Sequence, residues 1–158
     1  MSETGKGKEE RPPLSDSTPG YMRLEAWRFS DDLAVQLFHV TKSLPNNVRW
    51  LTTQITRAAT SAPANIAEGY GRASNREFFQ HLAVAHGSLH EVGYYIHFMG
   101  RTQLLNPSTC DNLMEQCQRA SRIVYGLMKS VRSDTSDRTM NRRYLRELPE
   151  VYATIDDE

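Results

Sequence analysis

Apolar residues recur at intervals of three and four along four long stretches of the chain, which is the spacing of one face of an α-helix. No strand-like alternation of apolar and polar residues competes with this pattern. We expect helices over residues 24–43 and 47–69, from Ser74 to Gly100, and from Asn106 to Val131. The sequence therefore predicts an all-α fold, an antiparallel up-down-up-down four-helix bundle with short loops.

The second and fourth of these stretches differ in the side chains that they offer for packing. The fourth keeps the most regular apolar spacing, which indicates knobs-into-holes packing, at Cys110, Leu113, Cys117, Ala120, Val124, Leu127 and Val131. The second contains small residues that let a neighbour approach closely, at Ala58, Ala59, Ala62 and Ala64. We expect residues 54–71 to be a tightly packed internal element rather than a catalytic pocket.

Short motifs mark where the first two helices end. Pro45 ends the first helix, because the residue before a proline is pushed out of the α region, and Asn46 or Asn47 then caps the second helix. The run Gly69-Tyr70-Gly71 predicts a left-handed stop for the second helix.

The third and fourth helices have recognisable N-terminal caps. Ser74 and Glu77 have the spacing of a capping box, in which each side chain bonds the other residue's backbone N–H. Asn106-Pro107 is an N-cap followed by a proline at the first helical position, where its missing donor does no harm. Gly100 is expected to cap the end of the third helix.

Charge is distributed unevenly along the 158 residues, although nineteen basic side chains balance nineteen acidic ones. The bundle, over residues 21–132, carries a net charge of +4 and all five histidines, whereas the tails carry −1 and −3. A mildly basic body is compatible with a polyanionic partner without requiring one. We expect residues 1–20 to be disordered. Residues 133–158 are expected to be mostly disordered or to form a short helix over Met140–Leu148.

The cysteines and the lengths of the apolar runs indicate the cellular compartment in which the protein is expected. Cys110 and Cys117 lie roughly 10 Å apart along one helix, too far to form a disulfide with each other, so we expect buried thiols in a reducing compartment. No apolar run approaches the length of a membrane span, and the N-terminus does not resemble a signal peptide. The sequence predicts a cytoplasmic protein that makes no membrane contact.

Two long motifs carry a resemblance to a known family. They are LTTQITRAATSAPANIAEGYG (51–71) and SNREFFQHLAVAHGSLHEV (74–92), and they resemble the bacterial four-helix-bundle family of 23S rRNA intervening-sequence proteins. That family also includes the accessory variability determinant of diversity-generating retroelements. The resemblance implies a homopentamer without enzymatic activity. It also implies, for the accessory determinant, binding to a reverse transcriptase and to nucleic acid.

A set of polar and small positions within these motifs is the first candidate site. Arg57, Glu68 and Glu91 match the charged positions of the family. We expect the set to fix helix packing or a subunit interface through charge-assisted hydrogen bonds, while a recognition site is the alternative. The members are Arg57, Ser61, Asn65, Glu68, Gly69, Gly87, Ser88 and Glu91.

Basic residues form the second candidate site. As phosphate contacts they would give sequence-independent, salt-dependent binding to RNA or DNA, and as solvated surface charges they would do nothing specific. The sequence shows no interleaving of aromatic residues and arginines of the kind found in single-strand binding proteins. The candidates are Lys42, Arg49, Arg72, Arg76, Arg119, Arg122, Lys129 and Arg132.

Three histidines share a face of the third helix, namely His86, His90 and His97. A spacing of four can place two imidazoles on one metal ion, but no glutamate, cysteine or aspartate in a suitable position completes a site. Half-buried structural histidines are the alternative. We therefore predict no metal and no cofactor, and keep a metal-dependent bundle that uses His86 and His90 as the alternative function.

The sequence contains no readable catalytic arrangement. Ser61, Ser88 and the histidines form no triad, no glycine-rich phosphate loop is present, and no carboxylates can be paired across a cleft. The preferred function is a non-enzymatic, homo-oligomeric helical scaffold or adaptor. Its expected partners are further copies of itself, a protein such as a reverse transcriptase, and RNA or DNA.

Overall fold

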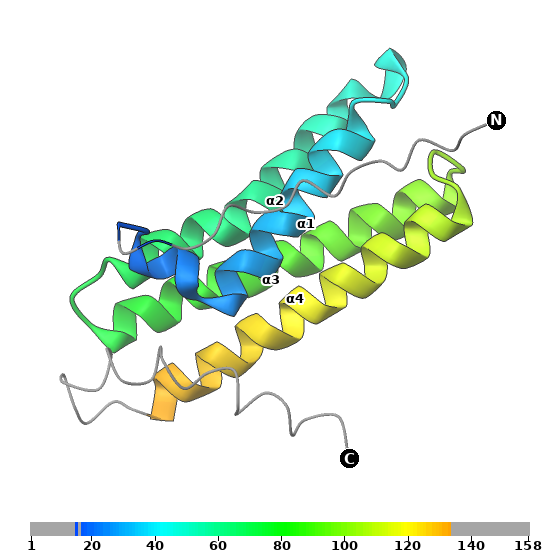
Figure 1. Cartoon of the computed structure of the whole chain (residues 1–158). Helices are drawn as coiled ribbons and strands as arrows, with labels where there is room; N and C mark the ends of the chain where they lie inside the picture. The colour runs from blue at the N-terminus through cyan, green and yellow to red at the C-terminus, as the bar shows by residue number, and fades with distance from the viewer. Residues whose placement is uncertain (1–14, 16, 134–158) are drawn as a thin grey trace.

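The computed structural model describes residues 15 and 17–133 (Figure 1). It contains four α-helices, α1 (Glu25–Thr41), α2 (Arg49–Tyr70), α3 (Asn75–Arg101) and α4 (Pro107–Ser133), and two short 3-10 helices, η1 (Gly20–Arg23) and η2 (Asn46–Val48). The described residues contain no strand, which confirms the all-α prediction. The predicted tails lie outside the described residues except for 15, 17–20 and 133, and so does the short helix predicted at Met140–Leu148.

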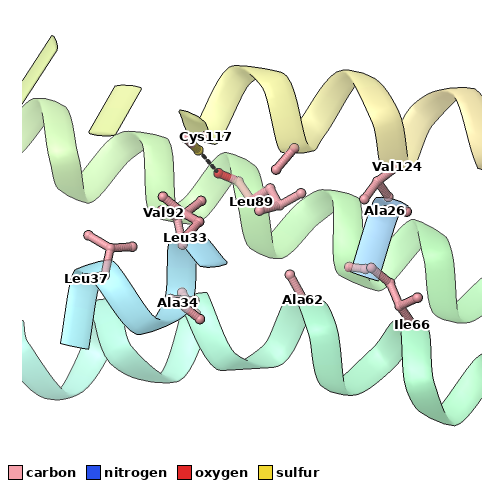
Figure 2. Packing of buried hydrophobic residues seen from close by; sticks show 14 of the residues in the cluster. Ala26, Leu33, Ala34, Leu37, Ala62, Ile66, Leu89, Val92, Cys117 and Val124 are labelled. Atoms are coloured by element: carbon pink, nitrogen blue, oxygen red, sulfur yellow. Dashed lines mark hydrogen bonds between the residues drawn. The ribbon is translucent and has the colours of Figure 1, made fainter. Parts of the chain in front are cut away.

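All four helices contribute to one apolar core. Helix α1 packs against α2 and α4, and α3 also packs against α2 and α4. Figure 2 shows buried side chains from every helix in contact around this centre, among them Leu33, Ile66, Leu89 and Val124. Fully burying one such side chain contributes about 1.5–3 kcal/mol, so the core is the main source of stability.

The regular apolar seam predicted for the fourth stretch is confirmed in α4. Leu113, Cys117, Ala120, Val124, Leu127 and Val131 are all buried, and Cys110 is half-buried at the start of the seam. The predicted small-residue packing in α2 is confirmed for Ala58, Ala59 and Ala62. Ala64 is exposed instead, beside residues of α1.

The start of α2 differs from the prediction. The chain enters it through the 3-10 turn η2, and neither Asn46 nor Asn47 caps it, because the N-cap residue is Val48 and it makes no side-chain bond. Pro63 is buried inside the helix.

Helix α2 stops at the predicted glycine run, with Gly71 as its C-cap, but the predicted left-handed conformation is wrong, and so is the predicted Gly100 cap of α3. Gly71 has a right-handed φ of −80°, and the N–H groups of Gly71 and Arg72 bond the carbonyls of Glu68 and Gly69. These i→i+3 bonds tighten the last turn of α2.

At the end of α3, Gly100 is an ordinary helical residue, and Gln103 takes the left-handed conformation with φ 59°. The N–H groups of Gln103 and Leu104 bond the carbonyls of Gly100 and Met99, which is a Schellman motif. Glycine adopts this conformation more readily than glutamine does. Gln103 nevertheless takes it, because hydrogen bonds hold the backbone on both sides of it.

The other two caps are formed largely as predicted. Ser74 Oγ accepts the Glu77 N–H at 3.3 Å, while the Ser74 hydroxyl donates to the Glu77 carboxylate at 2.7 Å instead of leaving that carboxylate for a backbone donor. Asn106 Oδ1 accepts the Thr109 N–H at 2.9 Å. Among the described residues, no helix has both the length and the apolar character needed to cross a lipid bilayer.

Candidate functional site

A line of polar side chains follows the outer edge of the contact between α2 and α3. At the end of this line nearer the start of α2, the Arg57 guanidinium donates to Gln54 Oε1 at 3.2 Å. It also lies 3.6 Å from the carboxylate of Glu91 on α3. This ion pair is largely exposed, so its contribution to stability is about 0–1 kcal/mol. Its exposure leaves both charges accessible to a partner.

The middle of the line joins the two helices by hydroxyl and amide groups. Ser88 Oγ lies 2.9 Å from Ser61 Oγ and 3.0 Å from the Val84 carbonyl. Asn65 Nδ2 donates to the Ser61 carbonyl at 2.8 Å, and Asn65 Oδ1 lies 3.3 Å from His81 Nδ1. Each satisfied bond of this kind contributes about 0.5–1.5 kcal/mol, so this part of the predicted site fixes helix packing.

The last part of the line lies near the loop between α2 and α3. Glu68 pairs with Arg72 in the loop that follows α2 and lies 3.9 Å from His81 Nε2. Glu68 and Arg57 are eleven residues apart on α2, roughly 16 Å, so the predicted charged network is divided into two separate groups.

Gly69 explains why α2 and α3 approach so closely at this end. An added Cβ at Gly69 would lie 2.6 Å from His81 Cβ and 2.8 Å from Phe78 Cδ2. The position is buried, so this glycine is required by packing within the chain.

Gly87 behaves differently from the other predicted residues. It is exposed on α3, and an added Cβ would meet no atom within 4 Å. The expectation that it marks a close approach of helices is therefore wrong within the chain.

Large apolar side chains are exposed along the same α2–α3 side of the bundle as Gly87. Val84 and Tyr94 of α3 are 52% and 59% exposed, and Trp50 of α2 is 58% exposed with its ring edge-on to Phe98 at 6.3 Å. Sequence reasoning missed these three because it followed only residues on the apolar stripe or in the family motif. The feature that could have indicated them is a large aromatic or β-branched residue at a position outside the apolar stripe of its helix. We call the set Trp50, Arg57, Val84, Gly87, Glu91 and Tyr94 the α2–α3 face.

The predicted phosphate contacts do not converge on one surface. Lys42 and Arg49 lie at one end of α2, and Arg72 and Arg76 lie at the other, roughly 30 Å away. Several of the eight are engaged within the chain. The Lys42 ammonium sits over Phe38 at 4.3 Å, the Arg119 guanidinium stacks over Phe29 at 4.2 Å, and Arg72 pairs with Glu68.

Three further predicted cations, Arg122, Lys129 and Arg132, are exposed on α4, where an aromatic residue joins them. Tyr125 is 51% exposed, with Arg122 about one turn before it and Lys129 about one turn after it. The centroid of the Tyr125 ring lies 5.6 Å from the Lys129 ammonium and 5.6 Å from the centroid of the His86 ring of α3. We call the set His86, His90, Arg122, Tyr125 and Lys129 the α3–α4 patch; Arg132 is exposed further along α4.

The two histidines of this patch pack against each other. The rings of His86 and His90 are edge-to-face with centroids 4.6 Å apart. Burial, and then the proximity of His90, lower the pKa of His86. Within the part of the chain that the structure describes, no three His, Cys, Asp or Glu side chains come together to hold a metal ion. The alternative metal site is thus limited to two imidazoles.

The cysteine thiols serve packing. Cys117 and Cys110 donate to the carbonyls of Leu89 and Ile96 at 3.2 and 3.3 Å; the first of these bonds is the dashed line in Figure 2. Burial raises the pKa of Cys117 to about 11 and also raises that of Cys110. A thiol that stays protonated is a poor nucleophile, so neither cysteine has the character of a catalytic residue.

A model of the 23S rRNA-intervening sequence protein family matches residues 22–126. The chain belongs to this family. The match includes α1, α2, α3 and most of α4, and therefore all of the α2–α3 face. It confirms the resemblance predicted from the motifs at 51–71 and 74–92.

Among solved structures, the chain is similar to a protein of unknown function from the S23 ribosomal protein family of Bacteroides thetaiotaomicron. The TM-score is 0.62 at 23% identity, and the match covers 66% of this chain and 95% of that one. At this identity the likeness supports the shared fold alone. No curated protein matches the chain.

Proposed function

We propose that this member of the family is a non-enzymatic, homo-oligomeric helical scaffold whose copies associate through the α2–α3 face. The homopentamer implied by the family resemblance is the assembly that we favour. Within each subunit the bundle is antiparallel in this proposal. The contacts of α3 with α4 support that arrangement, because they pair Gly100 with Cys110 and Gly93 with Cys117 in opposite order along the two helices.

The observation that carries the proposal is the open space around Gly87. A glycine in a helix interior is about 1 kcal/mol less favourable than alanine, and nothing in the described chain requires one at this position. A glycine on an exposed face, next to the exposed side chains of Val84 and Tyr94, is suited to close approach by a second backbone. The Arg57–Glu91 pair beside it supplies charges that a neighbouring copy would bind.

Substituting Gly87 tests the assembly without damage to the subunit. In Gly87→Gln the added side chain points into solvent, so the monomer should keep its helical circular dichroism and gain stability. The close approach of a second chain should be blocked, and sedimentation equilibrium at micromolar concentration should then find a monomer where the parent is an oligomer.

Gly71→Gln is the matched control. Gly71 is also exposed, and its Cβ would lie at an ordinary 3.5 Å from the Glu68 carbonyl oxygen with a right-handed φ. This variant should keep the oligomeric state of the parent. A parent that is monomeric at micromolar concentration, or an oligomer that tolerates Gly87→Gln, would refute the proposal.

We also propose that the assembly contacts RNA or DNA through the α3–α4 patch. Cations one turn either side of an exposed tyrosine are suited to phosphate contacts and to stacking on a base. Arg122 and Lys129 have exposed side chains, and the Tyr125 ring between them is half-exposed. A protein partner such as a reverse transcriptase remains a proposal that rests on the family resemblance.

A salt series tests the nucleic-acid proposal. Binding of labelled RNA and duplex DNA should weaken with salt, with a log–log slope set by the number of phosphate contacts. Lys129→Gln should reduce that slope by about one, and Lys42→Gln, far from the patch, should leave it unchanged. No binding of either nucleic acid at low salt would rule out the nucleic-acid role.

A further inference from the structure

Aromatic rings from two helices form a row across the outer edge of the contact between α3 and α4. The His90 ring lies edge-to-face against the His86 ring, with centroids 4.6 Å apart. The His86 ring lies 5.6 Å from the Tyr125 ring of α4, and the two planes are inclined by only 34°. Because His86 is half-buried, the middle ring of the row is held by the bundle. Tyr125 is therefore part of a supported aromatic surface and is not an isolated side chain.

Cations flank this row along α4. Arg122 lies three residues before Tyr125, and Lys129 and Arg132 lie four and seven residues after it. Helix positions at these intervals share one face, and all three cationic side chains are exposed. Residues 116–133 include no acidic residue. This part of α4 thus presents positive charge beside the rings, which favours an anionic ligand.

We propose that the α3–α4 patch binds an unpaired strand of nucleic acid, with one base stacked on Tyr125 and neighbouring phosphates on Arg122 and Lys129. This inference rests on the proposed binding of RNA or DNA, and it names the form of nucleic acid that the same surface selects. Proteins that hold single strands without reading their sequence combine aromatic stacking with a positively charged track. The α3–α4 patch contains both components.

The Tyr125 ring is accessible to a base. The residue is 51% exposed, although His86 lies beside the ring. The Lys129 ammonium lies 5.6 Å from the ring centroid, close to the limit of about 6 Å for a cation–π contact. Lysine has a flexible stem, so this ammonium can move from the ring to a phosphate when a base takes its place. One strand thereby engages the ring and the cation together.

A duplex cannot use the rings in the same way. Its base faces are stacked inside the double helix, and exposing one base requires unstacking and unpairing it. A duplex is therefore limited to phosphate contacts with Arg122, Lys129 and Arg132, which carry no base stacking. Ribose and deoxyribose leave the base faces and the phosphates unchanged, so we expect single strands of RNA and of DNA to bind alike.

The other group of exposed rings is less suited to a polyanion. Trp50 and Tyr94 of the α2–α3 face are 58% and 59% exposed, which is similar to Tyr125. That face contains one cation and one anion, Arg57 and Glu91, and these lie 3.6 Å apart as an ion pair. Its rings therefore lack the excess of positive charge found beside Tyr125, and we assign this face to contact between subunits.

Substitution of Tyr125 in the full chain tests the stacking. The first probe is a fluorescein-labelled oligo-dT strand of about ten nucleotides, within the range that one binding module covers. The second is the same strand annealed to oligo-dA. At equal salt, fluorescence anisotropy should show tighter binding of the single strand than of the duplex. Tyr125→Leu should weaken single-strand binding roughly 5- to 150-fold, as expected for the loss of one stacked base, and should leave duplex binding unchanged.

Tyr125→Phe is the matched control, because it keeps the ring and removes only the hydroxyl. It should bind the single strand as the parent does, whereas Lys129→Gln should weaken binding of both probes. Equal binding of strand and duplex by the parent, or no loss in Tyr125→Leu, would overturn the stacking proposal and leave phosphate binding by the patch in place. No binding of either probe at low salt would refute the nucleic-acid proposal itself, and this inference with it.

Photocrosslinking locates the stacked base. A strand with 5-iodouracil in place of one thymine crosslinks under ultraviolet light to an aromatic side chain that stacks on it. Trypsin cleaves after Arg122 and Lys129, so a crosslink to Tyr125 should appear in the peptide 123–129. A crosslink found only in other peptides would overturn the proposal.

Discussion

Helix α3 makes two long contacts that differ in chemistry. Its contact with α4 is apolar, with thiols bonded to carbonyls and a glycine at its tightest point. The Cys117 thiol donates to Leu89, and a Cβ added at Gly100 would lie 2.7 Å from Cys110 Sγ. Its contact with α2 has a polar outer edge in which side chains meet side chains, as between Ser61 and Ser88.

This difference indicates which residues of α3 stabilise the folded subunit and which are available for association with a second copy. Within the contact with α4, the polar groups described are two thiols bonded to carbonyls, while the larger rings of His86 and Tyr125 lie at its outer edge. At the outer edge of the α2–α3 contact, hydroxyls and amides are satisfied locally, while an ion pair and large apolar side chains stay at the surface. We therefore expect substitutions in the α3 core to affect folding, and substitutions on the α2–α3 face to affect association.

The largest expected effect is that of removing a core side chain. Leu89 is 1% exposed, so Leu89→Ala should lower the free energy of unfolding by about 2–5 kcal/mol, measured by urea denaturation. Val84→Ala removes methyl groups from the exposed face of the same helix and should change that free energy by about 0.5 kcal/mol or less. Equal losses in the two variants would mean that the exposed face is part of the folding core.

The second effect concerns the closest approach of α2 and α3. Gly69→Ala adds a methyl group where His81 and Phe78 leave no room, and overpacking of this kind should cost about 1–3 kcal/mol in thermal or urea unfolding. Gly71→Ala has space and an ordinary backbone conformation, so it should stabilise by about 0.4–1 kcal/mol. If Gly69→Ala also stabilises the protein, the close contact described here is incorrect.

The third effect probes the polar edge itself. Ser88→Ala removes a buried hydroxyl and its bond to Ser61, which should cost about 1 kcal/mol in the free energy of unfolding. Combining it with Ser61→Ala in a double-mutant cycle should give a coupling energy of about 0.5 kcal/mol or more. Additive losses would show that the two hydroxyls do not stabilise each other.

The smallest effect is a pH dependence at the other edge of α3. The pKa of His86 is lowered in the folded chain from its ordinary value of 6.5, by burial and by His90. The Tyr125 ring also lies close to the His86 ring, and Lys129 lies over that tyrosine. Between the folded and unfolded pKa values the unfolded chain binds more protons, so stability should fall as the pH drops below about 6.5. Urea midpoints between pH 8 and 5 measure this loss, and His86→Gln should reduce it. An unchanged profile in that variant would assign the pH dependence to another group.

Local chemistry made several features predictable. The apolar spacing of α4 is independent of its neighbours, because any helix with that stripe must bury it, and its predicted positions are buried. The Ser74 and Asn106 caps were also predictable, since both use donors within three residues. The family motif indicated Ser61, Asn65 and Ser88 as a packing set, which agrees with their hydrogen bonds.

Other features depend on contacts between distant residues. Gly87 and Gly69 look alike in the sequence, yet one faces open space and the other faces His81. At the end of α3 the left-handed residue is Gln103, because the N–H of the next residue, Leu104, bonds back to the Met99 carbonyl. Gly100 would adopt this conformation more readily, but it lies inside the helix. Neither distinction follows from residue type.

Taken by itself, the amino-acid sequence determined the helices, their buried stripes, two of their caps and the family. These follow from interactions within about one helical turn, or from a motif long enough to be specific. Only the tertiary structure decided which polar residues meet, which glycine is exposed and where Tyr125 joins the cations. Those outcomes depend on how large and small side chains face each other across a helix pair, which is set by the packing of all four helices together.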